Sequence, residues 1–144
     1  MKLKINISKD IKEERIEVYA RDYSEEIEDL KTYLERRPSD KFSLFKDDFV
    51  DIVGAEEIIR IYAQDKKTYV KTRESTYTSR LRLKDFEERL SKFIRISRSE
   101  IVNLDFVKRL DLSFMGTIAL EFKDGHVSYV SRRNLKKFRQ ALGL

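Results

Sequence analysis

The feature that most constrains the fold is a succession of short segments in which apolar and polar residues alternate. They follow one another between residues 42 and 130, and turn-forming residues separate them. A two-residue period is typical of strands that bury one face, whereas a helix needs a period of 3.6 residues. We therefore expect strands at residues 42–45, 49–53, 58–63, 68–72, 75–80, 93–97, 106–112, 117–123 and 126–130.

Two segments of the same region have the helical period. The second begins at or just after Ser131 and ends at Gly143, a residue that suits a helix C-terminus. The apolar positions are Leu83, Phe86, Leu90 and Phe93 in the first helix and Leu135, Phe138 and Leu142 in the second. Many short strands with two small helices favour a mostly β domain over residues 41–144.

Residues 1–40 predict a small strand-strand-helix unit in front of this domain. Residues 1–7 and 15–20 alternate like half-buried strands. Residues 24–37 read as a helix that Ser24 caps, that Arg36 and Arg37 close and that Pro38 stops. Its apolar stripe is Ile27, Leu30 and Leu34. A unit this small is expected to pack on, or pair with, the β domain after it.

Composition excludes several classes of protein. Hydrophobic and charged residues each make up 40% of the 144 residues, which fits a folded domain with a charged surface. The absence of cysteine excludes disulfides and thiolate metal sites. The apolar runs are too short for a membrane span, and the N-terminus has no secretory h-region, so we expect a cytoplasmic protein without membrane contact.

The positive charge of the chain is unevenly distributed. Residues 1–40 carry 9 Lys or Arg against 11 Asp or Glu, whereas residues 41–144 carry 22 against 15. The excess gathers at residues 66–98 and 125–144. Clustered positive charge favours a polyanionic partner, because neutralising phosphates releases counterions. A second interpretation is that the lysines and arginines only keep the surface soluble.

Signs of an enzyme are missing from the sequence. His126 is the only histidine, and its place beside Gly125 in a predicted hairpin suggests a solvent-facing strand residue. The acidic pairs at residues 47–48 and 56–57 fall at turns, and the four glycines form no phosphate-binding loop. We expect no catalytic residues, no metal, no cofactor and no small-molecule substrate.

Three segments place cations where a regular pattern breaks. Arg132 and Arg133 open the last helix, although a helix N-terminus favours anions. A phosphate there would satisfy the free backbone N–H groups and the guanidiniums together. The alternative is that both arginines lie in solvent or pair with an acid such as Asp124. The other two segments are residues 65–69, which could be an ordinary turn, and residues 97–99, a predicted loop before Asn103, which reads as a turn cap.

These segments carry a resemblance to a known family. Residues 93–103, FIRISRSEIVN, resemble the central signature of the LytTR DNA-binding domain, roughly F-[IVL]-R-[IV]-[HS]-[RKN]-S-x-[IVL]-[VI]-N. Residues 130–133, VSRR, resemble its second block, and residues 81–90 resemble the helix that precedes the signature. The likeness runs from about residue 45 to the end. It departs at Ser97, where many members have histidine, and at residues 114–116, where a polar turn is more usual.

The resemblance implies an elongated, mostly β fold of packed small antiparallel sheets with short helices. It also implies that loops enter successive major grooves of double-stranded DNA. Base contacts would come from Thr68, Arg98 and Arg133. Contacts to the DNA backbone would come from Lys66, Lys67, Ser99, Arg132, Asn134 and Lys136.

The preferred interpretation is thus a bacterial transcription regulator that binds DNA as a homodimer on repeated half-sites. The segment of 40 residues is too short for a receiver domain, so the resemblance is to stand-alone members of the family. It implies that residues 1–40 serve dimerisation or signal input, and the alternative is a simple extension of the fold. The rival interpretation is a protein-interaction module whose basic loops bind an acidic protein partner.

Overall fold

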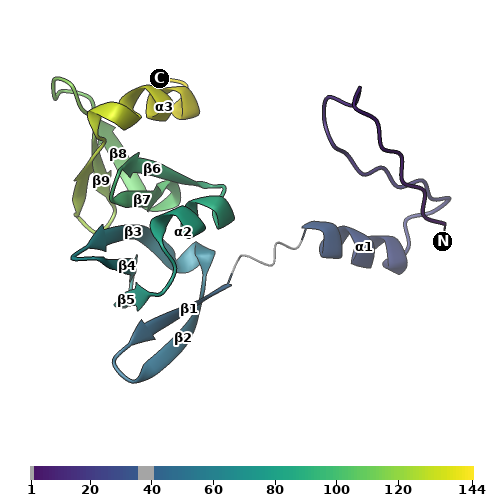
Figure 1. Cartoon of the computed structure of the whole chain (residues 1–144), viewed down its shortest axis with the longest axis horizontal. Coiled ribbons are helices and arrows are strands. Elements are labelled where there is room, and N and C mark those ends of the chain that lie inside the picture. The colour runs from purple at the N-terminus through teal and green to yellow at the C-terminus, as the bar shows by residue number, and fades with distance from the viewer. Residues whose placement is uncertain (1, 36–40) are drawn as a thin grey trace. The chain divides into compact units, whose positions relative to one another are not determined.

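The structure is a computed structural model that describes residues 2–35 and 41–144. It divides into a small N-terminal unit and a larger C-terminal unit, with the division at residue 36 (Figure 1). The larger unit contains all the strands that the structure assigns in these two described ranges.

The N-terminal unit contains the predicted helix, α1 (Glu25–Glu35). Ser24 caps it, because its side-chain oxygen accepts from the N–H of Ile27 at 3.3 Å and its carbonyl accepts from Glu28 at 3.0 Å. Acidic residues fill the first turn, where the helix dipole favours them. The predicted closing residues Arg36, Arg37 and Pro38, and the predicted boundary after residue 40, lie outside the described residues.

The two strands predicted ahead of α1 are not formed. Within residues 2–24 the structure assigns turns and bends but no strand, so the prediction for residues 1–7 and 15–20 is wrong. Leu3, Ile5 and Ile7 are 73–94% exposed, and Ile16 is 72% exposed. Alternation gives a segment one apolar face, but a strand also needs a bonded neighbour, and a lone hairpin is marginally stable in water.

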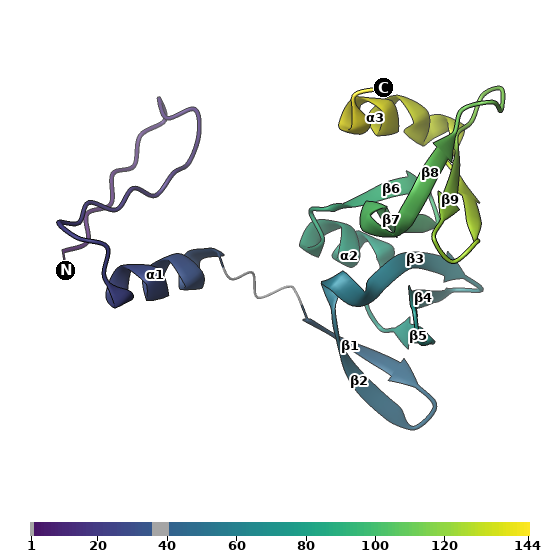
Figure 2. The ribbon, with the colours of Figure 1, turned by 180° about the vertical axis from the view of Figure 1, so that it is seen from behind.

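The C-terminal unit is built on a seven-stranded antiparallel sheet with the order β2-β1-β5-β4-β3-β7-β6 (Figures 1 and 2). Its strands are β1 (Lys41–Lys46), β2 (Phe49–Gly54), β3 (Ile58–Gln64), β4 (Lys67–Thr72), β5 (Thr76–Ser79), β6 (Phe93–Ser97) and β7 (Glu100–Asn103). All but β7 were expected from alternation. β7 has no alternation to detect, because Ile101 and Val102 are both fully buried.

A smaller sheet of three antiparallel strands packs beside the first, in the order β10-β9-β8. Its strands are β8 (Val107–Asp111), β9 (Ala119–Phe122) and β10 (Val127–Tyr129). The predicted hairpin at residues 124–125 joins the last two, and Gly125 has the positive φ of 90° that such a turn requires. The expectation of packed antiparallel sheets with short helices is confirmed.

Two short 3-10 helices connect the strands, η1 (Ala55–Glu57) and η2 (Leu104–Phe106). Asn103 begins η2 and is 4% exposed. Its side-chain oxygen accepts from the N–H of Asp105 at 3.0 Å, as expected of a turn cap, and its amide nitrogen donates to the carbonyl of Ile58 at 2.9 Å.

Each α-helix of the C-terminal unit covers a separate hydrophobic cluster. α2 (Leu83–Arg89) buries Leu83 and Phe86 against residues of β1, β3, β4 and β7. α3 (Arg132–Leu142) buries Phe138 in a second cluster that includes residues of β6, β9 and η2. Gly143 ends α3 in the left-handed conformation, with φ 69°, as predicted.

Candidate nucleic-acid interface

Two hairpin turns lie side by side where strands of the seven-stranded sheet end. Asp65 and Lys66 form the β3–β4 turn, and their φ angles of 51° and 64° are those of the turn that suits a two-residue hairpin. Arg98 and Ser99 form the β6–β7 turn. The N–H of Ala63, near the end of β3, donates to the carbonyl of Ser99 at 2.9 Å, which holds the two turns together.

The start of α3 lies next to the second of these turns. The N–H of Ser131 donates to the carbonyl of Ile96 at 2.8 Å, and the amide of Asn134 donates to the carbonyl of Arg95 at 3.5 Å. In Figure 1, β3 and β6 both run toward the left and α3 begins on that side. We call this border the cationic edge; it carries Lys66, Lys67, Arg98, Arg132, Arg133 and Lys136.

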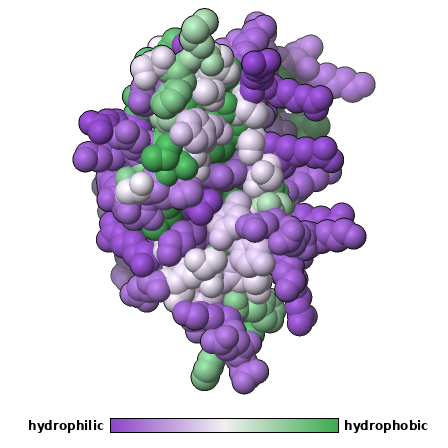
Figure 3. Space-filling view, turned by 90° about the vertical axis from the view of Figure 1, so that its left-hand side faces the viewer, coloured by the Kyte–Doolittle hydropathy of each residue, from purple (hydrophilic) through white to green (hydrophobic). Residues whose placement is uncertain are grey.

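The cations of this edge are exposed and unpaired. Each of the six has an exposed side chain. The ion pairs found among residues 2–35 and 41–144 join other residues, namely Arg15 with Glu17, Arg60 with Glu100, Arg95 with Glu87 and Arg109 with Glu121. Figure 3 faces the left-hand side of Figure 1, and long hydrophilic side chains project along one border of that face. The edge is therefore free to meet an anion.

The start of α3 is arranged for an anion from outside. Its first turn has no acidic residue. The hydroxyl of Ser131 donates to the side-chain oxygen of Asn134 at 2.8 Å and makes no cap with a backbone N–H. Asp124 accepts from the N–H of His126 and, among the described ion pairs, has none with Arg132 or Arg133. The predicted alternative of pairing with Asp124 is thus wrong, and solvent exposure is the alternative that remains.

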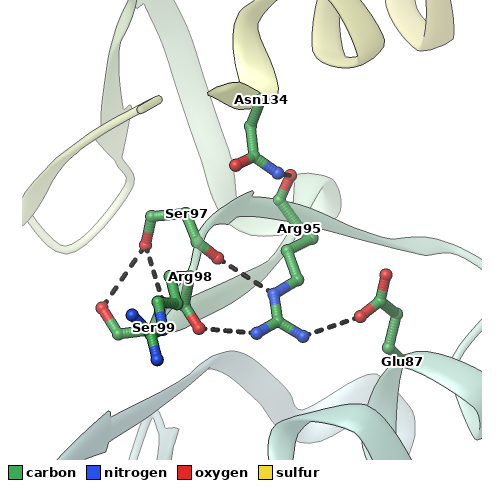
Figure 4. A network of polar contacts seen from close by, with 6 residues as sticks. All are labelled: Glu87, Arg95, Ser97, Arg98, Ser99 and Asn134. Atoms are coloured by element: carbon green, nitrogen blue, oxygen red, sulfur yellow. Dashed lines mark hydrogen bonds and ion pairs between the residues drawn. The ribbon is translucent and has the colours of Figure 1, made fainter. Parts of the chain in front are cut away.

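Arg95 holds the β6–β7 turn from the side of the sheet (Figure 4). Its guanidinium donates to the carbonyl of Ser97 at 3.0 Å and to the carbonyl of Arg98 at 2.5 Å. The third contact is to the carboxylate of Glu87 on α2, at 2.7 Å. The hydroxyl of Ser97 also accepts from the N–H of Ser99 at 3.2 Å, which closes the turn from within.

The structure brings the predicted site residues to one edge, but Thr68, Ser99 and Asn134 are less free to reach a partner than the six cations are. Thr68 lies in β4 and is half-buried, not in the loop where it was expected, because the turn needs only Asp65 and Lys66. Ser99 lies within 3.4 Å of the Ser97 hydroxyl, oxygen to oxygen. Asn134 uses both ends of its amide within the protein.

Two further arginines of this region, Arg95 and Arg80, were not among the predicted site residues. Arg95 was treated as part of a strand, although a charged residue between Ile94 and Ile96 in a segment that ends at a turn is a usable signal. Arg80 follows Ser79, which pairs with Thr68 at the same edge, and its guanidinium lies 4.7 Å from the ring centre of Phe45. A guanidinium that contacts a ring in this way keeps N–H donors for other partners.

His126 is half-buried, where the sequence suggested a solvent-facing residue, and hydrogen bonds connect it through Ser128 to Glu100, the residue that follows the β6–β7 turn. Ser128 donates to the carboxylate of Glu100 at 2.5 Å, which leaves the serine oxygen to accept from Nε2 of His126 at 3.0 Å. Burial, and next the positive charge of Arg60, lower the pKa of His126. The described part of the chain has no cluster of three or more His, Cys, Asp or Glu suited to a metal ion.

A β-rich body that presents exposed cations from two turns and a helix start is typical of a class of proteins that bind polyanions. Among the described elements no two α-helices follow each other directly in the chain, so a helix-turn-helix motif does not carry this edge.

Comparison with known proteins gives the family. Residues 51–143 match the LytTr DNA-binding domain family, LytTR. The chain therefore belongs to the LytTR family. The LytTr DNA-binding domain of a Bacillus cereus protein described as a methyl-accepting/DNA response regulator superposes with a TM-score of 0.70 at 33% identity, over 73% of this chain and 98% of that one.

Several curated relatives come from Staphylococcus aureus and are named uncharacterized HTH-type transcriptional regulators. The protein of strain NCTC 8325 / PS 47 is 34% identical over 96 residues, which is 66% of this chain and 65% of the relative. The protein of strain bovine RF122 / ET3-1 is 35% identical over the same length. The chain thus matches less than two thirds of the length of these relatives. In the described part of the chain, no helix is both long and apolar enough to cross a membrane.

Proposed function

We propose that this protein is a bacterial transcription regulator that binds double-stranded DNA in a sequence-specific manner and acts in the cytoplasm. One observation carries the proposal: the cationic edge, whose six side chains are exposed and without ion pairs among the described residues, lies in a LytTr DNA-binding domain. The relatives that are named transcriptional regulators support the same function.

Some residues of the turns and the helix start are proposed to contact bases, and others the DNA backbone. We infer that Arg98 and Arg133 each donate two hydrogen bonds to a guanine in successive major grooves, and that Thr68 approaches a third base. Lys66, Lys67, Ser99, Arg132, Asn134 and Lys136 contact the DNA backbone in this proposal. Ser99 and Asn134 would do so from positions that their internal hydrogen bonds already fix.

The N-terminal unit is the proposed dimerisation or signal-input element of residues 1–40. α1 buries none of its own residues, and a groove of about 750 Å³ lies between it and the segment before it. The apolar lining of this groove comes from Ile16, Val18, Tyr23, Ile27, Leu30 and Leu34. Covering this surface with a second copy would join two C-terminal domains, which then bind repeated half-sites of the DNA.

Selection of bound sequences from a random duplex pool tests the function directly. The purified chain is expected to enrich one repeated sequence, and its affinity for that sequence is expected to fall steeply with salt. Arg73→Ala is a matched charge control, because Arg73 follows the far end of β4 from Lys67. This variant is expected to keep wild-type affinity, whereas Arg133→Ala loses it.

The rival function, binding of an acidic protein through the same loops, makes a different prediction for this experiment. If no sequence is enriched and the chain does not bind duplex DNA at low salt, the proposed function is wrong and the rival function remains. Binding of all duplexes with equal affinity would contradict the sequence-specific part alone.

A further inference from the structure

We propose that Arg95 is a positioning residue that sets the direction of Arg98 and relates it to the start of α3, so that base discrimination depends on Arg95 without contact between Arg95 and DNA. This inference rests on the proposed function, in which Arg98 reads a base.

The β6–β7 turn needs support that the β3–β4 turn does not. In the β3–β4 turn, Asp65 and Lys66 both have positive φ, and the strands close without outside help. Arg98 and Ser99 are absent from the positive-φ residues of the described chain, so their turn lacks that geometry. Turns with negative φ at both central residues splay a hairpin. An outside contact that holds the turn is therefore of use here.

Arg95 supplies that contact by holding two successive carbonyls. Its Nε donates to Ser97 at 3.0 Å and its Nη2 donates to Arg98 at 2.5 Å. A guanidinium is planar and rigid, so two bonds to adjacent carbonyls fix the orientation of both peptide planes. The peptide planes on either side of an α-carbon set the direction of its side chain, and here that side chain is Arg98.

A bulge in β6 lies directly before these carbonyls. The register of β6 against β7 shifts between Arg95, which faces Ile101, and Ser97, which faces Glu100. Such a bulge inserts an extra residue, here Ile96, and redirects the strand. Ile96 is fully buried and anchors the bulge in the core. Beyond the bulge Ser97 pairs with Glu100 and the chain enters the turn, where the guanidinium of Arg95 meets the carbonyls of Ser97 and Arg98.

Arg95 also connects the turn to both neighbouring helices. Its Nη1 bonds the carboxylate of Glu87 on α2 at 2.7 Å, which prevents the guanidinium from rotating away. Its own carbonyl accepts from the amide of Asn134 on α3 at 3.5 Å. The side chain of Arg95 therefore holds Arg98, while its main chain is bonded to the helix that carries Arg133.

A direct role of Arg95 on DNA is a different hypothesis with a different signature. The side chain of Arg95 is 23% exposed and already makes three contacts within the protein. A phosphate contact would lower affinity for all sequences alike and reduce the salt slope by about one unit. A positioning role lowers discrimination at one base pair and leaves the salt slope unchanged.

The experiment uses the full chain and the sequence that it selects. Arg98→Ala first identifies the base pair at which discrimination is lost. Arg95→Gln and Arg95→Lys are then measured against all four base pairs at that position, together with the double variant Arg95→Gln/Arg98→Ala. Lysine keeps the charge but cannot span two carbonyls and a carboxylate, so it also serves if Arg95→Gln fails to fold. The matched control is Arg109→Gln, which breaks the exposed ion pair with Glu121.

Arg95→Gln and Arg95→Lys are expected to lose at least about fivefold of discrimination at the base pair that Arg98 reads. The double variant is expected to discriminate no worse than Arg98→Ala, because residues that act through one another are not additive. Arg109→Gln should match the wild type.

Unchanged discrimination in Arg95→Lys, a further loss in the double variant, or a salt slope reduced by about one unit would overturn the positioning role while leaving the proposed function standing. A wild-type chain without sequence preference would overturn the proposed function, and the inference with it.

Discussion

The side-chain amide of Asn103 donates to the carbonyl of Ile58, 2.9 Å away, inside the C-terminal unit. The two residues are 45 positions apart in the chain, and the bond ties the end of β7 to the beginning of β3. The two turns of the cationic edge lie at the other ends of β3 and β7. This bond therefore fixes the two strands that carry the turns relative to each other.

Asn103→Ala is expected to lower the free energy of unfolding by about 1–3 kcal/mol, because the carbonyl of Ile58 is left buried without its partner. Urea unfolding followed by circular dichroism measures the change. The urea dependence of the free energy should remain that of the wild type. A loss below about 0.5 kcal/mol, the range of ordinary surface changes, would show that water replaces the amide.

Phe138→Ala is expected to lower the free energy of unfolding by about 3–5 kcal/mol, because Phe138 is fully buried in the second cluster. Its exposed neighbour gives the control, since Lys137→Ala should stay within about 0.5 kcal/mol of the wild type. Equal effects of the two changes in urea unfolding would mean that α3 is not packed as described.

Lys66→Ala and Arg133→Ala are expected to weaken DNA binding in different ways. A lost phosphate contact should weaken binding of every sequence and flatten the salt dependence by about one unit, which is expected of Lys66→Ala. A lost guanine contact should remove about 1–3 kcal/mol of discrimination at one base pair, which is expected of Arg133→Ala. Titrations at several salt concentrations, with the selected site and its single-base variants, separate them. Identical profiles would contradict the division of roles.

Ile27→Asp is expected to abolish dimerisation of the full chain, because a charge would then have to be buried in the groove beside α1. Sedimentation equilibrium measures the molecular mass, and Asp29→Asn on the same helix serves as the control. A variant that dimerises like the wild type would assign residues 1–40 to signal input, the other proposed role.

Stability is expected to fall as the pH drops below about 6.5, the ordinary pKa of histidine. Burial, and then Arg60, lower the pKa of His126 in the folded chain, against weaker opposite effects of Glu100 and Asp124. The unfolded chain therefore binds a proton at a higher pH than the folded chain does, and acid favours unfolding. Urea unfolding at pH 7.5 and pH 5.5 should show a smaller loss for His126→Gln than for the wild type. Equal losses would rule out this histidine as the cause.

Alternation predicted most of the C-terminal strands, and it did so most clearly where one face of the strand is buried, as in β1. It failed for residues 1–7 and 15–20, where the same pattern meets no neighbouring strand. It also missed β7, where Ile101 and Val102 are both buried. Periodicity reports which faces a segment could bury, and only the tertiary structure decides whether something covers them.

Candidate site residues could be predicted where the residue type alone was unusual for its position in an element. Arg132 and Arg133 stood out because cations at a helix start oppose the dipole. The role of Arg95 could not be predicted, since it depends on where a bulge in β6 leaves the carbonyls of Ser97 and Arg98. Thr68 was misplaced because Asp65 and Lys66 make the turn alone with positive φ, a conformation that lysine rarely adopts, so that β4 already begins at Lys67.

The bond between Asn134 and Arg95 has a consequence for how the sequence can diverge. Along the chain, four strands separate Arg98 from Arg133, yet across the fold the two elements are joined through β6. Insertions or deletions in the exposed connection at residues 112–116 should thus leave the spacing between the two arginines intact. A single residue added within β6 should change that spacing at once, so β6 is expected to keep a constant length among descendants of this sequence.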